Sequence, residues 1–270
     1  MRLEADRLEK YFATSDLLAA RGISVSVFDE LDSTNSEARR CAAQGRLAPS
    51  ETRVLIALSQ SAGRGRMGRS FFSPVATGLY FTMLFDATNM TSEKMLCLTP
   101  AAAVAVVRAA RALGVDGARI KWVNDILVGG KKACGILAES FSLDDKRYVA
   151  LGIGVNLFTN SFPRELEHIA TSLFDTSLAE ERSSILQRTA ELLAAELYDL
   201  KRSIEGGDLS YMNEYRSASA VLGRRVSYVK DGVEIFGEAI GVDDLGRLSV
   251  REDSGRTTVL SGGEISLFLK

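Results

Sequence analysis

The stretch Gln60–Pro74 places the strongest constraint on the fold, because its residues suit neither a helix nor a strand. It interleaves glycines with arginines, namely Gly63, Arg64, Gly65, Arg66, Gly68 and Arg69. Glycine lets the backbone adopt positive φ and approach a ligand closely, and arginine supplies a rigid fork of donors for carboxylates and phosphates. The stretch follows an apolar run, Val54–Leu58, that is typical of a buried strand. The sequence therefore predicts an anion-binding loop at the end of a buried strand.

The same glycines match the spacing of a dinucleotide-binding fingerprint, Gly63-x-Gly65-x-x-Gly68. That fingerprint has to open a helix, and Phe71-Phe72-Ser73-Pro74 cannot continue one. A Walker A motif is also absent, since residues 129–132 lack the upstream glycine and the following serine or threonine. Phosphate binding by this chain therefore needs a different scheme.

Hydrophobic patterning predicts an α+β fold with a mixed, largely antiparallel sheet, because many strands follow one another with few helices between them. Strands are predicted at 24–28, 54–58, 78–85, 119–123, 126–128, 134–140 and 148–155. Helices are predicted at 3–20, 34–43, 99–113, 183–204 and 209–215. A capping box of Thr34 and Glu37 would open the second helix, and Thr99 with Pro100 would open the third.

The composition changes after about Ser219. Short alternating strands are predicted at 225–229, 234–242, 247–251 and 257–259, with turn residues between them. This spacing is typical of a small all-β barrel. We therefore expect two domains, residues 1–218 and residues 219–270.

Composition excludes several kinds of chemistry. His168 is the only histidine, so a serine–histidine–aspartate triad or a multi-histidine metal site is nearly ruled out. The net charge of -2 gives no overall basic field for nucleic acid or anionic lipid. No apolar run is expected to span a bilayer, the charged N-terminus does not resemble a signal peptide, and the three cysteines suit a reducing compartment. A cytoplasmic protein that works through lysine, arginine and backbone N–H groups is expected.

Two further segments carry candidate functional groups, each with a structural alternative. Lys121 lies on an otherwise apolar predicted strand beside Trp122, and a buried lysine is costly unless an anion pairs with it. The alternative is a lysine at a strand end whose side chain reaches water. Ser33-Thr34-Asn35 could cap a helix or offer polar groups to a ligand, and the two roles are compatible.

Several motifs, in their order along the chain, resemble those of biotin protein ligases. The matching segments are Leu31–Asn35, Gln60 with Gly63–Pro74, Lys121–Asp125, Gly135–Leu137, Gly152–Asn156 and Gly262–Leu267. The resemblance implies a class II synthetase-like catalytic domain followed by an SH3-like barrel. Val123 stands where the family usually has proline, which affects backbone rigidity rather than the reactive groups. About thirty residues precede the first motif, so the single-function type without a DNA-binding domain is expected.

The resemblance also implies an activity and its residues. Biotin would be activated by ATP as biotinyl-5′-AMP and transferred to a lysine of a biotin carboxyl carrier protein. Lys121 and Arg66 would be catalytic. Contacts to biotin or biotinyl-AMP would come from Ser33, Thr34, Asn35, Gln60, Gly63, Arg64, Gly65, Arg66, Lys121 and Gly135. Contacts to the nucleotide would come from Arg69, Phe71, Asn124 and Asn156.

The remaining expectations concern cofactors, partners and competing functions. Mg²⁺ would be held mostly by phosphates and water, with no protein metal site. The partners would be biotin, ATP and the carrier protein of a biotin-dependent carboxylase, without DNA or membrane, and a homodimer stays open. A lipoate-type protein ligase and a non-catalytic biotin-binding regulator are the alternatives. An RNA-binding module is disfavoured, because the arginine loop lacks interleaved aromatic residues.

Overall fold

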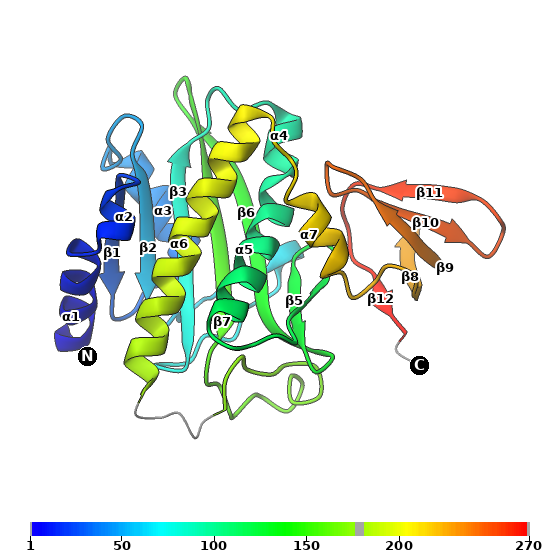
Figure 1. The fold of residues 1–270 in the computed structure, drawn as a ribbon, viewed down its shortest axis with the longest axis horizontal. Coiled ribbons are helices and arrows are strands. Elements are labelled where there is room, and N and C mark those ends of the chain that lie inside the picture. The colour runs from blue at the N-terminus through cyan, green and yellow to red at the C-terminus, as the bar shows by residue number, and fades with distance from the viewer. Residues whose placement is uncertain (1, 176–180, 269–270) are drawn as a thin grey trace.

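The computed structural model describes residues 2–175 and 181–268, and it contains two β-sheets (Figure 1). The larger sheet has seven strands in the order β1-β2-β3-β7-β6-β5-β4. Their bounds are β1 (Ile23–Phe28), β2 (Thr52–Ala57), β3 (Gly78–Asp86), β4 (Arg119–Lys121), β5 (Asp125–Val128), β6 (Lys131–Leu143) and β7 (Lys146–Asn156). Strands β1 and β2 are parallel, and the other neighbouring pairs are antiparallel. The predicted mixed, largely antiparallel sheet is therefore confirmed.

Helices cover both faces of this sheet. They are α1 (Arg2–Ala13), α2 (Asp16–Ala19), α3 (Thr34–Ala43), α4 (Ser92–Leu96), α5 (Leu98–Ala112), α6 (Arg182–Gly206) and α7 (Met212–Ser217). Helices α5 and α6 lie side by side across one face, where they pack on residues such as Ile56 and Met83 (Figure 1). Helix α3 packs on the opposite face against Leu55 and Leu84. Successive strand residues point to opposite faces, so the apolar residues 54–57 of β2 can serve both cores.

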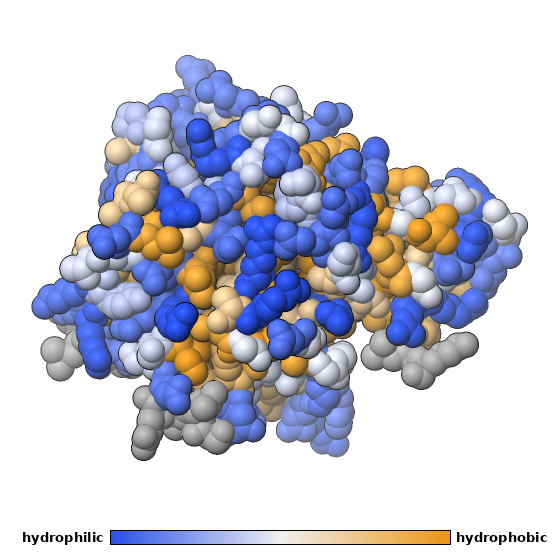
Figure 2. All heavy atoms as spheres, viewed as in Figure 1, coloured by the Kyte–Doolittle hydropathy of each residue, from blue (hydrophilic) through white to orange (hydrophobic). Residues whose placement is uncertain are grey.

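Helix α5 is a core helix. The stretch Ser92–Ala112 is long and apolar enough to cross a membrane by length and composition, contrary to the expectation from the sequence. Two thirds of it (67%) is buried inside the protein. On the face seen in Figure 2, hydrophobic groups occur in patches between hydrophilic ones. The apolar character of α5 is therefore accounted for by packing on the sheet and on α6.

Two predicted helix caps are wrong, although both helices begin within one residue of the predicted positions. Helix α5 begins at Leu98 directly after α4, so Thr99 is not its N-cap. Helix α3 has Ser33 at its N-cap, and no side chain makes a capping bond there. The hydroxyl of Thr34 instead contacts Thr82 in the sheet, and Glu37 forms ion pairs with Arg40 and Arg46. The α3 cap failed because its residues have other partners, and the α5 cap failed because α4 continues directly into α5.

The C-terminal sheet is antiparallel, with the strand order β11-β10-β9-β8-β12. Its strands are β8 (Arg225–Lys230), β9 (Val233–Val242), β10 (Leu248–Glu252), β11 (Thr257–Leu260) and β12 (Ser266–Leu267). Trp122 ties the two sheets together, because its Nε1 donates to the carbonyl of Gly246 at 2.8 Å. The predicted short strands are present, and β12 was not predicted. Closure into a barrel stays a prediction, since no pairing of β11 with β12 occurs among the described residues.

Candidate functional site

A cavity lies beneath the glycine–arginine loop, between the start of α3 and strands β3, β6 and β7. It brings together most of the residues predicted from the sequence, namely Ser33, Thr34, Asn35, Gln60, Arg64, Gly65, Arg66, Phe71, Asn124 and Gly135. The cavity is also lined by residues that were not predicted as site residues, namely Tyr80, Phe81, Lys132, Ile136, Leu137, Gly152, Ile153 and Gly154. Segments that are far apart in the sequence therefore form one site of mixed polar and apolar character. Gly63, Arg69, Lys121 and Asn156 do not line this cavity.

The loop is folded back on itself as a tight hairpin. The N–H of Gly65 donates to the carbonyl of Arg69 at 2.7 Å, and the N–H of Phe71 donates to that of Gly63 at 2.8 Å. At the tip, Met67 and Gly68 have φ values of 55° and 75°. The second of these is a left-handed conformation that favours glycine. The hairpin thereby directs the side chains of its arginines away from the loop.

The three arginines contact different residues, four in all. Arg64 Nη2 donates to Glu139 Oε1 at 2.8 Å. Arg66 Nη1 donates to Asn124 Oδ1 at 2.9 Å and to the carbonyl of Gly263 at 3.1 Å. Arg69 forms an ion pair of 2.6 Å with Glu264. Two of the arginines thus join the loop to the segment between β11 and β12, which closes one side of the site.

Lys132 lines the cavity beneath the loop, whereas Lys121, the predicted catalytic lysine, does not, and the role of Lys121 stays a prediction. Lys121 lines a neighbouring cavity with Arg69 and Glu264, whereas Lys132 lines both cavities. The ammonium of Lys132 pairs with Asp125 Oδ1 at 2.7 Å. Gly135 makes room for it, because a Cβ at that position would lie 3.1 Å from Lys132 Nζ. Residues 129–132 were considered as a possible Walker A motif, and Lys132, which lies in β6, was not selected as a site residue.

Phe71 separates the two cavities. Its ring lies against Gly154, where a Cβ would sit 2.5 Å from Phe71 Cε1. It also lies against Gly135 and meets the ring of Tyr80 edge-on, with centroids 6.5 Å apart. Phe71 lines both cavities. Glycine in β7 is therefore what allows an aromatic ring to stand in the middle of the site.

Two other predicted residues, Gly63 and Asn156, contact the backbone around the site. A Cβ on Gly63 would lie 2.4 Å from the carbonyl oxygen of Phe71, so glycine is required for the hairpin to close. Asn156 is buried, and its Nδ2 donates to the carbonyl of Thr171 at 3.1 Å. Neither residue lines either cavity. A direct contact of Asn156 with a nucleotide stays a prediction.

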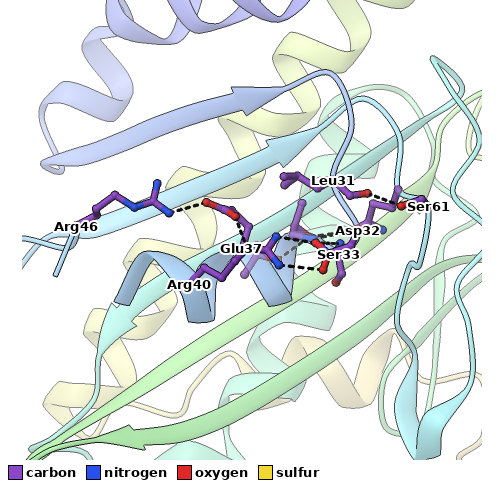
Figure 3. Close-up of polar contacts among 10 residues, drawn as sticks. Leu31, Asp32, Ser33, Glu37, Arg40, Arg46 and Ser61 are labelled. Atoms are coloured by element: carbon purple, nitrogen blue, oxygen red, sulfur yellow. Dashed lines mark hydrogen bonds and ion pairs between the residues drawn. The ribbon is translucent and has the colours of Figure 1, made fainter. Parts of the chain in front are cut away.

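A cluster of charged residues anchors the segment that carries Ser33 and Thr34 (Figure 3). Arg40 makes a double hydrogen bond to the carboxylate of Asp32, at 2.6 and 2.9 Å, and a further one to Glu37. The backbone N–H of Ser33 also donates to Asp32 Oδ1 at 2.7 Å. The Arg40 hydrogen bonds lower the pKa of Asp32 from 3.8 to about 2. The ionised form of Asp32 therefore stabilises the entry to α3.

Acid is expected to loosen this entry. Because the folded-state pKa of Asp32 is about 2 and its ordinary value is 3.8, its contribution is present above about pH 4 and is lost as the pH falls toward 2. Urea unfolding midpoints measured across this range should fall less steeply with acid for Asp32→Asn than for the unmodified protein. Arg40→Met should likewise flatten the profile. Profiles of the same steepness in all three proteins would contradict this assignment.

Comparisons with known proteins agree with this geometry. Residues 28–156 match the Biotin/lipoate A/B protein ligase family, and residues 221–267 match the Biotin protein ligase C terminal domain. The chain is 32% identical over 246 residues to the biotin--[acetyl-CoA-carboxylase] ligase of Mycobacterium tuberculosis, covering 89% of this chain and 88% of that protein. It is 32% identical to the bifunctional ligase/repressor BirA of Bacillus spizizenii, covering 86% of this chain and 71% of that protein.

The fold agrees as well. A solved structure, the biotin protein ligase from Aquifex aeolicus in complex with biotin and ATP, superposes with a TM-score of 0.71 at 25% identity. The superposition covers 91% of this chain and 99% of that one. Sequence identity over most of both chains and the shared arrangement of strands point to the same conclusion. The chain belongs to the biotin protein ligase family.

Proposed function

We propose that this chain is an ATP-dependent ligase that activates biotin as biotinyl-5′-AMP and transfers it to a lysine of a biotin carboxyl carrier protein. The observation that carries the proposal is the polarity of the cavity. Arg64, Arg66 and Lys132 offer cationic groups to the cavity, and Thr34 and Gln60 offer neutral polar groups. Biotin has a carboxylate at one end and a neutral ureido ring at the other. The proteins of Mycobacterium tuberculosis and Aquifex aeolicus to which this chain is similar are named as biotin ligases.

The binding arrangement follows from the lining of the two cavities. The ureido ring would lie near Ser33, Thr34 and Gln60, with Ile136 and Ile153 against its apolar surfaces. The carboxylate would face Arg66 and Lys132, whose charges offset the repulsion between two anions. Such a ligand needs both fixed donors and apolar walls, and this cavity supplies them.

The nucleotide would occupy the neighbouring cavity. Arg69, Lys121, Asn124 and Lys132 line it, and Phe71 stands between it and the biotin cavity. The aromatic ring offers a face for a base, and the cations offer partners for phosphates. Lys121 is accordingly assigned to the phosphates, and Lys132 takes the place between carboxylate and α-phosphate that the sequence analysis gave to Lys121.

The chemistry requires positioning and charge rather than a covalent enzyme intermediate. A biotin carboxylate oxygen attacks the α-phosphorus, a new C–O–P linkage forms, and the bond to pyrophosphate breaks. In the second step the neutral amine of the acceptor lysine attacks the biotinyl carbonyl carbon. The C–O bond then breaks, AMP leaves with the electron pair, and the nitrogen loses a proton. Lys132 and Arg66 stabilise the negative charge that develops at phosphorus.

Mg²⁺ would enter with ATP. No group of three or more metal-binding side chains occurs in the described parts of the chain. The two carboxylates that line the nucleotide cavity, Asp125 and Glu264, are paired with Lys132 and Arg69. Phosphates and water would therefore supply most of the ligands of Mg²⁺.

The remaining parts of the proposal concern organisation. We place the catalytic domain at residues 1–218 and the C-terminal domain, an SH3-like barrel, at residues 219–270. The contacts of Arg66 and Arg69 with Gly263 and Glu264 support a role of the second domain in closing the site. A cytoplasmic location and the absence of DNA and membrane partners belong to the same proposal, and a homodimer is left open.

One incubation tests the function. The protein is mixed with Mg-ATP, labelled biotin and a biotin carboxyl carrier domain, and both pyrophosphate release and label on the carrier are measured. Both are expected, and a carrier domain whose acceptor lysine is replaced by arginine should remain unlabelled. Labelled lipoate serves as the competing substrate, because the matched family includes lipoate ligases. Pyrophosphate release without label transfer, label transfer from lipoate alone, or neither product would refute the assignment.

A further inference from the structure

Thr82 is a fully buried polar residue in the middle of β3, directly beneath the start of α3. It is 0% exposed and does not line the cavity. Its Oγ1 lies 2.8 Å from Thr34 Oγ1 and 2.7 Å from Asn35 Oδ1. A buried hydroxyl in a strand that is otherwise apolar is costly unless its hydrogen bonds are made. The bonds it makes go to two residues that do line the cavity.

The positions of the protons in this cluster follow from counting donors. Asn35 Nδ2 donates to the carbonyl of Leu137 and to Glu139 Oε2, which fixes the orientation of the amide. Asn35 Oδ1 carries no proton, so the single proton of the Thr82 hydroxyl is given to it. The contact between Thr82 and Thr34 then needs the proton of Thr34. The hydroxyl of Thr34 is thus directed into the protein, and its lone pairs are left for the cavity.

The hydrogen bonds of Gln60 are consistent with this assignment of the protons. Its Oε1 already accepts the backbone N–H of Thr34 at 2.8 Å, and the hydroxyl of Thr34 lies farther away, at 3.2 Å. Its Nε2 donates to Ser73 Oγ at 3.0 Å. The oxygens of Thr34 and Gln60 therefore present acceptors along the same wall of the cavity.

The neighbouring strand β7 leaves space for the side-chain amide of Asn35. Gly152 of β7 is paired with Thr82, and a Cβ on Gly152 would lie 2.2 Å from Asn35 Oδ1. The amide of Asn35 therefore reaches Thr82 through space that a side chain at residue 152 would fill. On its other side, Glu139 connects the amide to Arg64 of the loop.

We propose that Thr82 is a positioning residue that makes Thr34 a hydrogen-bond acceptor for a ligand N–H, and thereby selects the ureido group of biotin. The inference rests on the proposed function and deepens it, because it assigns substrate recognition to a residue that does not touch the substrate. An apolar residue at this position would release the proton of Thr34 and leave the amide oxygen of Asn35 unpaired.

Biotin binding in the absence of ATP tests the proposal, by titration calorimetry on the full chain. Thr82→Val should raise the Kd for biotin about tenfold to a hundredfold. Thr82→Ser keeps the hydroxyl and should stay within about threefold of the unmodified protein. ATP affinity should not change in either variant. Thr189→Val is the matched control, because Thr189 is also buried but donates within α6, to the carbonyl of Ile185.

A second readout separates hydrogen-bond direction from packing. The unmodified protein should bind biotin much more tightly than an analogue methylated on its ureido nitrogens, and this ratio should shrink in Thr82→Val. If Thr82→Val does not fold, Thr82→Ala also removes the hydroxyl and provides the same test. Unchanged biotin affinity in the folded variant, equal losses for biotin and ATP, or failure of Thr82→Ser to bind would overturn the proposal. An unmodified protein that does not bind biotin would instead refute the proposed function.

Discussion

Replacing Lys132 with methionine is expected to slow pyrophosphate release by about 10²–10³-fold, with folding intact. Methionine keeps much of the apolar stem and removes the charge that faces both cavities. Lys121→Met should slow the reaction much less and should mainly raise the KM for ATP, because Lys121 lines only the neighbouring cavity and not the one beneath the loop. Single-turnover assays with saturating biotin and ATP separate the two effects. The comparison decides which lysine lies between the carboxylate and the α-phosphate.

Lys131→Met is the control for this prediction. Lys131 is the adjacent residue in β6, but it is exposed, and its Nζ donates to the carbonyl of Glu167. Its replacement should leave pyrophosphate release near that of the unmodified protein. A larger loss in Lys121→Met than in Lys132→Met would restore the assignment made from the sequence.

Gly154→Ala should lower kcat/KM for ATP by about tenfold to a hundredfold. The added Cβ would lie 2.5 Å from Cε1 and 2.7 Å from Cζ of Phe71, so the ring has to move. Overpacking of this kind costs about 1–3 kcal/mol, and 1.4 kcal/mol corresponds to a factor of ten. Initial rates of pyrophosphate release at varied ATP and at varied biotin concentrations measure the effect on each substrate.

Gly241→Ala is the matched control for Gly154→Ala. Gly241 also lies in a strand, β9, and nothing would lie within 4 Å of its added Cβ. Its kinetics should not change. Gly154→Ala kinetics equal to those of the control would mean that the position of Phe71 does not matter for the nucleotide.

Most of the fold could be predicted from local patterns. The bounds of β1, β3 and α3 agree with the predicted segments within one residue. The reason is that the spacing of apolar residues along the chain indicates which positions are buried. The predicted capping box of α3 failed because the Thr34 hydroxyl has a tertiary partner, Thr82, in the sheet. The strand β12 has two residues, and a pattern so short carries little signal.

The site could be predicted in part. The loop, the start of α3 and the Lys121–Asp125 segment were recognised as functional, and all three contribute residues to one cavity, the third through Asn124. The sequence could not tell which of two lysines faces it. Lys121 lies at the end of β4, while Lys132 is placed by pairing of β6 with β5 and by the missing side chain of Gly135. Distances of this kind depend on strand register, which residues far apart in the chain decide together.

The sequence by itself determined the glycine–arginine loop, the order of strands and helices, and the family to which they are similar. Those features depend on local backbone preferences and on the types of residue present. Only the tertiary structure decided that Lys132 rather than Lys121 lines the cavity beneath the loop, that Phe71 stands against Gly154, and that Thr82 lies within hydrogen-bond distance of the Thr34 hydroxyl. These contacts join β3, β6 and β7 to α3 and the loop, so they exist only once the sheet has brought the segments together.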